Sequence, residues 1–67
     1  MIGLYEQRKK KGYTQSDVAK ALGVKQNTVC QWEIGERKPD IINLKKLANF
    51  LNCNLEELLK GIWMEVI

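Results

Sequence analysis

The sequence predicts an all-α protein that forms one compact domain of five short helices. Apolar residues recur at helical spacing in successive segments along the chain. Proline occurs once, and four glycines (Gly12, Gly23, Gly35 and Gly61) follow the ends of these segments, where a left-handed helix cap favours glycine. A chain of 67 residues has room for one small core. We therefore expect a helical domain over residues 1–61, followed by an apolar tail over residues 62–67.

The first helix is expected over residues 2–11. Leu4 and Arg8 are four positions apart and therefore share one face of that helix. Gly12 ends it, and the three lysines before this glycine lie at the negative end of the helix dipole, where cations are favoured.

The second helix is expected to begin at Thr14 and the third at Lys25 or Gln26. The Thr14 hydroxyl can accept a backbone N–H of the first turn, and Asp17 completes a variant of the capping box. Gly23 ends the second helix and Gly35 the third. The residues expected to form the buried frame of this pair are Val18, Ala19, Leu22, Gly23, Val24, Val29 and Trp32.

The fourth and fifth helices have their own start signals. Asp40 is a favourable N-cap for the fourth, and Asn54 with Glu57 has capping-box spacing for the fifth, which Gly61 should end. The apolar positions predicted to face the core are Ile41, Leu44, Leu47, Ala48 and Leu51 on the fourth helix and Leu55, Leu58 and Leu59 on the fifth.

The spacing within residues 14–35 is typical of a helix-turn-helix, two short helices that cross over a tight turn. Counted from Gln15, Ala19 is fifth, Gly23 ninth and Val29 fifteenth. A small side chain is needed where the helices cross, and glycine reaches the positive φ of the turn at little cost. Such a unit presents its second helix to the major groove of DNA.

The polar residues of the third helix suit contact with DNA bases. Asparagine and glutamine carry a donor and an acceptor, and can pair with the N6 and N7 atoms of adenine. The predicted base contacts are Gln26, Asn27, Thr28 and Gln31, and the predicted phosphate contacts are Gln15, Lys25, Arg37 and Lys38. The alternative is a merely solvated polar face, but the spacing before this helix favours a DNA-reading surface.

Composition supports a nucleic-acid partner and argues against several other classes. The net charge is +3, with eight basic and four acidic residues over positions 1–38 but three and four over positions 39–67. There is no histidine, and two lone cysteines provide neither a disulfide framework nor a zinc site. We therefore expect no enzyme, metal, cofactor or small-molecule ligand. We also expect no membrane span or signal peptide, and a cytoplasmic location.

The segments TQSDVAKALGV, QNTVCQWEIGERKP and NLKKLANFLNCNLEELL resemble the phage repressor and Cro family of helix-turn-helix regulators, also called the Xre family. The resemblance extends from Leu4 to Lys60 and implies a five-helix domain that binds operator DNA as a two-fold dimer. It also implies an ion pair between Arg8 and Glu33. The family usually has Ser or Thr at the start of the third helix, where this chain has Lys25, so water or a DNA phosphate would cap that helix here.

Apolar residues outside the expected core form a second candidate surface. Ile42 and Phe50 on the fourth helix, together with the tail, are predicted to be exposed. The residues predicted to build a dimer interface are Phe50, Ile62, Trp63 and Val66. The alternative is that the tail folds back over the domain's own core.

These observations predict a sequence-specific transcriptional regulator, such as a prophage repressor, that binds a palindromic site in double-stranded DNA as a homodimer. The alternative is an antitoxin of a toxin–antitoxin pair, which would bind a toxin protein and repress its own operon.

Overall fold

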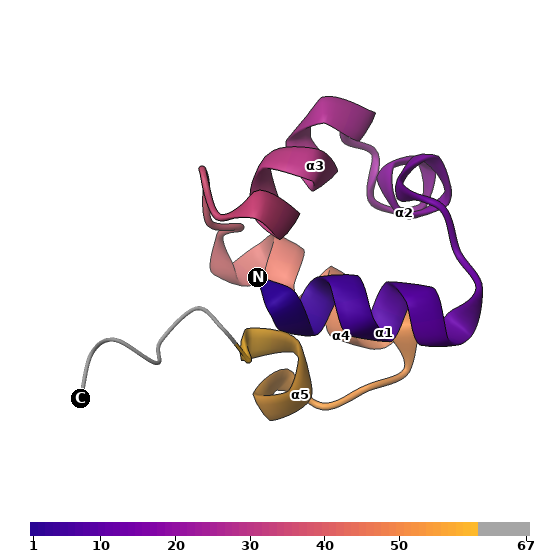
Figure 1. Ribbon diagram of the computed structural model, residues 1–67, viewed down its shortest axis with the longest axis vertical. Helices are drawn as coiled ribbons and strands as arrows, with labels where there is room; N and C mark the ends of the chain where they lie inside the picture. The colour runs from indigo at the N-terminus through magenta and orange to yellow at the C-terminus, as the bar shows by residue number, and fades with distance from the viewer. Residues whose placement is uncertain (61–67) are drawn as a thin grey trace.

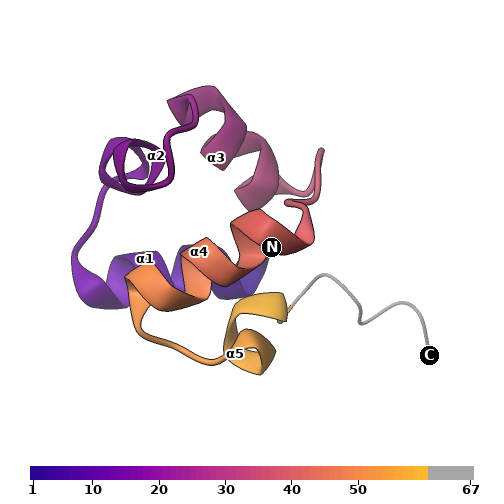
Figure 2. The same ribbon diagram turned by 180° about the vertical axis from the view of Figure 1, so that it is seen from behind.

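The computed structural model describes residues 1–60 of the chain and confirms the all-α fold. The helices are α1 (Ile2–Lys11), α2 (Gln15–Leu22), α3 (Gln26–Ile34), α4 (Ile41–Leu51) and α5 (Leu55–Leu59). Figures 1 and 2 show α2 and α3 at one end of the molecule, α5 at the other, and α1 and α4 between them. The predictions for Gly61, Ile62, Trp63 and Val66 concern positions outside the described residues.

The predicted start signals of three helices are confirmed by side-chain hydrogen bonds. Thr14 accepts from the backbone N–H of Asp17, whose carboxylate accepts from the N–H of Thr14, so the capping box is complete. Asn54 and Glu57 form a second capping box at the start of α5. At the start of α4, the Asp40 side chain accepts a hydrogen bond from the backbone N–H of Asn43. The start of α3 differs, because its N-cap Lys25 makes no side-chain capping bond.

All five helices contribute to a single core. Its members are Met1, Leu4, Val18, Ala19, Leu22, Val29, Trp32, Leu44, Leu47, Leu51 and Leu58. No role was predicted for Gly3, which is buried where α1 crosses α5. A Cβ atom at this position would overlap the carbonyl oxygens of Glu57 and Leu58, so only glycine allows so close an approach.

Several burial predictions need correction. Ile41 and Leu55 are 59% and 37% exposed, because each is the first residue of its helix and the buried stripe begins one turn later. Gly23 lies at the surface with φ 75°, since the turn between α2 and α3 faces solvent. Val24 is only half-buried, although it packs against the core.

Phe50 was predicted to be exposed, and this is wrong. Its ring is half-buried against the ring of Tyr13, which lies in the segment that joins α1 to α2, with 4.6 Å between the ring centroids. Ile42, in contrast, is 62% exposed, as predicted. The place of Phe50 in a dimer interface stays a prediction, with less of its ring accessible than expected.

Candidate nucleic-acid interface

The outward face of α3 is set by the residues that pack beneath it. Val29 and Trp32 are buried in the core, and α3 packs mainly against α2. The turn before it contains Gly23 in the left-handed region, with its N–H bonded to the carbonyl of Lys20. Because this packing fixes the rotation of α3, the side chains on its other face point away from the core.

The predicted base contacts lie on that outer face. Gln26 and Asn27, the first two residues of α3, are exposed, while Thr28 and Gln31 are half-buried. Amide groups therefore stand at the N-terminal end of the helix, which is the end that enters the major groove in helix-turn-helix proteins. Lys25 is exposed immediately before them.

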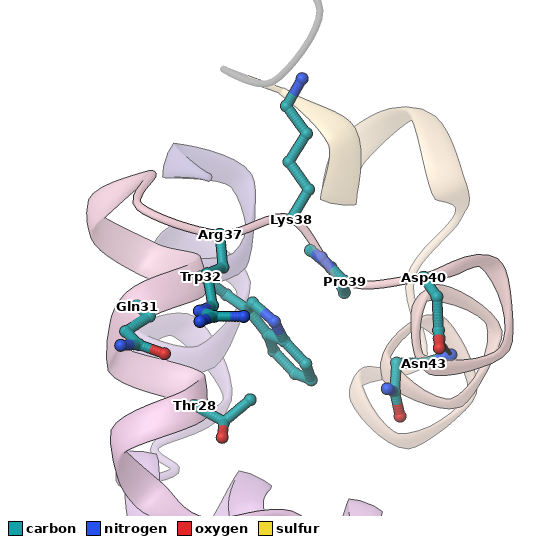
Figure 3. Close-up of a pocket in the computed structure, with 8 residues that line it drawn as sticks. All are labelled: Thr28, Gln31, Trp32, Arg37, Lys38, Pro39, Asp40 and Asn43. Carbon is teal, nitrogen blue, oxygen red and sulfur yellow. Dashed lines mark hydrogen bonds between the residues drawn. The ribbon is translucent and has the colours of Figure 1, made fainter.

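An open hollow of about 300 Å³ separates α3 from the start of α4. Its lining residues, drawn in Figure 3, are Thr28, Gln31, Trp32, Arg37, Lys38, Pro39, Asp40 and Asn43. Two predicted base contacts and two predicted phosphate contacts thus meet around one hollow, although the Lys38 side chain extends away from the other seven (Figure 3). Sequence reasoning missed Asn43, which also lines this hollow. The available signal was its position three residues after the N-cap Asp40, which places it on the first turn of α4.

The C-terminal half of α3 is joined to α1 by the ion pair that the resemblance implied. Arg8 donates from Nε to Glu33 at 2.6 Å and from Nη2 at 3.1 Å, and its Nη1 donates to the carbonyl of Tyr13. The two charged side chains are only 10% and 6% exposed. The hydrogen bond with Glu33 raises the pKa of Arg8 above its usual value. Two buried partners in bidentate geometry fix α3 relative to α1.

Gln15 contributes to the same cluster, which the sequence did not indicate. Its Nε2 donates to Oε1 of Glu33 at 3.0 Å. The N-terminal ammonium group of Met1 donates two further hydrogen bonds, to the backbone carbonyls of Trp32 and Glu33 near the C-terminal end of α3. A positive group is favoured at that end of a helix. The phosphate contact predicted for Gln15 would use the remaining donor of its amide.

One hydrogen bond joins the N-terminal halves of α2 and α3. The Ser16 hydroxyl donates to Oε1 of Gln26 at 3.0 Å. Ser16 is half-buried, whereas Gln26 is exposed. A predicted base-reading amide therefore has an intramolecular partner on the neighbouring helix.

Residues 1–60 contain neither a metal-binding cluster nor a membrane-spanning helix. That part of the chain contains no group of three or more acidic or cysteine side chains placed to hold a metal ion. None of its helices is long and apolar enough to cross a membrane.

Comparison with known proteins places residues 4–58 in the family model described as helix-turn-helix. The chain is 41% identical over 54 residues to the SPbeta prophage-derived uncharacterized HTH-type transcriptional regulator YonR of Bacillus subtilis, covering 81% of this chain and 50% of that protein. It is 41% identical over 51 residues to the uncharacterized HTH-type transcriptional regulator YazB of the same species, covering 76% and 74%.

A phage protein is also among the relatives. Repressor protein C2 of Salmonella phage P22 is 39% identical over 54 residues, covering 81% of this chain and 25% of the phage protein. No solved structure matches the chain. The chain spans about half the length of the first of these relatives. The matched region contains the crossed helices, the exposed amides and the Arg8–Glu33 pair, and the chain belongs to the helix-turn-helix family of the Xre, or Cro/C1, type.

Proposed function

We propose that this protein is a transcriptional regulator that reads a palindromic operator in the major groove with α3. The observation that carries the proposal is the pair of exposed amides, Gln26 and Asn27, at the N-terminal end of a helix whose opposite face is buried. Each amide can pair bidentately with adenine. Thr28 and Gln31 lie further along the same helix and extend the surface toward the hollow.

Phosphate contacts on both sides of α3 would set its register on the duplex. Lys25 and Gln15 lie at the starts of α3 and α2, and Arg37 and Lys38 follow α3. Such contacts position a protein on DNA without distinguishing sequences. Lys38→Ala should therefore weaken binding to all sequences alike and reduce the slope of affinity against salt by about one.

The dimer is the second part of the proposal. Two copies related by a two-fold axis would place their α3 helices about 34 Å apart, one turn of B-DNA, which a palindromic site requires. The exposed side chain of Ile42 supports an apolar contact with a second copy. Phe50, Ile62, Trp63 and Val66 are the other residues that we propose for this interface.

Selection of bound sequences from a random DNA pool, at a stated salt concentration, tests both parts. A palindromic consensus is the expected result. A consensus without two-fold symmetry, with one protein copy per DNA in sedimentation equilibrium, would contradict the dimer. Recovery of no preferred sequence would contradict the proposed function itself.

A further inference from the structure

We propose that Ser16 is a positioning residue that orients the amide of Gln26 and so determines which base Gln26 recognises. The inference rests on the proposed function, because it concerns how α3 distinguishes sequences. Its basis is the hydrogen bond of 3.0 Å from the Ser16 hydroxyl to Oε1 of Gln26. This bond joins residues ten positions apart, across the turn between α2 and α3.

The two neighbouring positions at the start of α2 have different partners. The amide of Gln15 donates to Glu33, near the C-terminal end of α3, rather than to Gln26. Ser16, the next residue, contacts Gln26 at the N-terminal end of α3. The contact with the predicted base-reading amide therefore depends on a single hydroxyl, and its removal leaves the Gln15–Glu33 bond in place.

The bond leaves Gln26 able to pair with a base. An amide oxygen accepts two hydrogen bonds, so Oε1 keeps one acceptor position after the bond with Ser16, and Nε2 keeps both N–H groups. Adenine needs one acceptor for its N6 amino group and one donor for N7. The amide of Gln26 can supply both while it remains bonded to Ser16.

A fixed amide should discriminate more sharply than a mobile one. Guanine presents two acceptors, O6 and N7, so an oriented Oε1 would face another acceptor at O6. A mobile Gln26 could rotate and donate to guanine instead. Ser16 also restricts the side chain before DNA binds, which lowers the entropy lost on binding.

The test uses the full chain and the DNA site obtained by selection from a random pool. Gln26→Ala identifies the base pair that Gln26 reads, since preference at that pair disappears. Ser16→Ala should reduce the preference for adenine over guanine at the same pair by about two- to tenfold and leave preferences elsewhere unchanged. Ser16→Thr, which keeps the hydroxyl, should restore the preference.

A double-mutant cycle separates positioning from a direct phosphate contact by Ser16. If Ser16 acts through Gln26, adding Ser16→Ala to Gln26→Ala should have no further effect on affinity. An equal loss of affinity at all sequences, also present in the Gln26→Ala background, would show a phosphate contact and overturn the inference.

A second measurement needs no DNA. In the free protein, side-chain amide relaxation by NMR should show Gln26 more mobile in Ser16→Ala than in the wild type, with Asn27 as the internal control. Unchanged discrimination by Ser16→Ala on a site that the wild type does select would overturn the inference while the proposed function stands. A wild-type chain that selects no site would overturn both this inference and the proposed function.

Discussion

At its C-terminal end, α3 is attached to the rest of the domain by buried polar groups, whereas its N-terminal end has one hydrogen bond between side chains. The carboxylate of Glu33 accepts hydrogen bonds from Arg8 and Gln15. The backbone carbonyls of Trp32 and Glu33 accept hydrogen bonds from the N-terminal amine of Met1. At the other end, Lys25 makes no side-chain cap and Gln26 has Ser16 as a partner. The difference separates two tasks: one end of α3 fixes its orientation, and the other leaves polar groups exposed, as the proposed contact with DNA requires.

The largest expected effect is at the C-terminal end. Glu33→Ala leaves the guanidinium of Arg8 buried without its carboxylate, and should lower the free energy of unfolding by about 3–5 kcal/mol. Urea unfolding of the variant measures this loss. Glu36→Ala, which removes an exposed carboxylate just beyond α3, is the matched control and should change stability by less than about 0.5 kcal/mol. Equal losses in the two variants would show that the buried pair has no special role in stability.

The N-terminal end should give the opposite pattern. Gln26→Ala removes an exposed side chain, so the free energy of unfolding should change by less than about 0.5 kcal/mol. Binding to the selected site should weaken by about 1–3 kcal/mol, with preference relaxed at one base pair. Titration of the selected DNA and of single-base variants measures both effects. Unchanged discrimination would mean that α3 does not read bases through Gln26.

The difference between the two ends could be predicted only in part. The spacing of Ala19, Gly23 and Val29 predicts the crossed helices, because helix packing and turn geometry restrict those positions locally. The Arg8–Glu33 pair followed from a family resemblance. In contrast, the bonds of Gln15 and Ser16 depend on where two helices meet, and a polar residue on a helix does not specify its partner across the turn.

Burial was hardest to predict where the contact comes from a distant segment. No neighbour in sequence explains why position 3 is glycine, because the restriction on side-chain size there comes from the carbonyls of α5. Phe50 looked exposed because helical spacing places it off the apolar stripe, but Tyr13 packs against it from the segment before α2. Long-range contacts of this kind depend on the tertiary arrangement, which periodicity within one helix does not describe.

A smaller effect is expected from supplying the side-chain cap that α3 lacks. Lys25 already has the extended backbone of an N-cap, with φ −81° and ψ 151°. Lys25→Ser should therefore stabilise the fold by about 1 kcal/mol relative to Lys25→Ala, which removes the same charge without adding a cap. Urea unfolding of the two variants measures the difference. No difference between them would indicate that the first turn of α3 cannot use a cap.

The smallest effect concerns the capped start of α2, which differs from the start of α3 in containing a titratable group. Backbone and side-chain hydrogen bonds with Thr14 lower the pKa of Asp17 below its usual value of 3.8. Because the folded-state pKa is the lower one, the stabilisation by ionised Asp17 is complete above the usual pKa and is lost as the pH falls through the folded-state pKa.

Asp17→Asn keeps a side-chain acceptor but removes the charge, so the wild type should be more stable than the variant at neutral pH. Unfolding measured between about pH 6 and pH 2 should show this advantage shrinking only at the acid end. An advantage that stayed constant down to the lowest pH would show that the charge of Asp17 does not stabilise the start of α2.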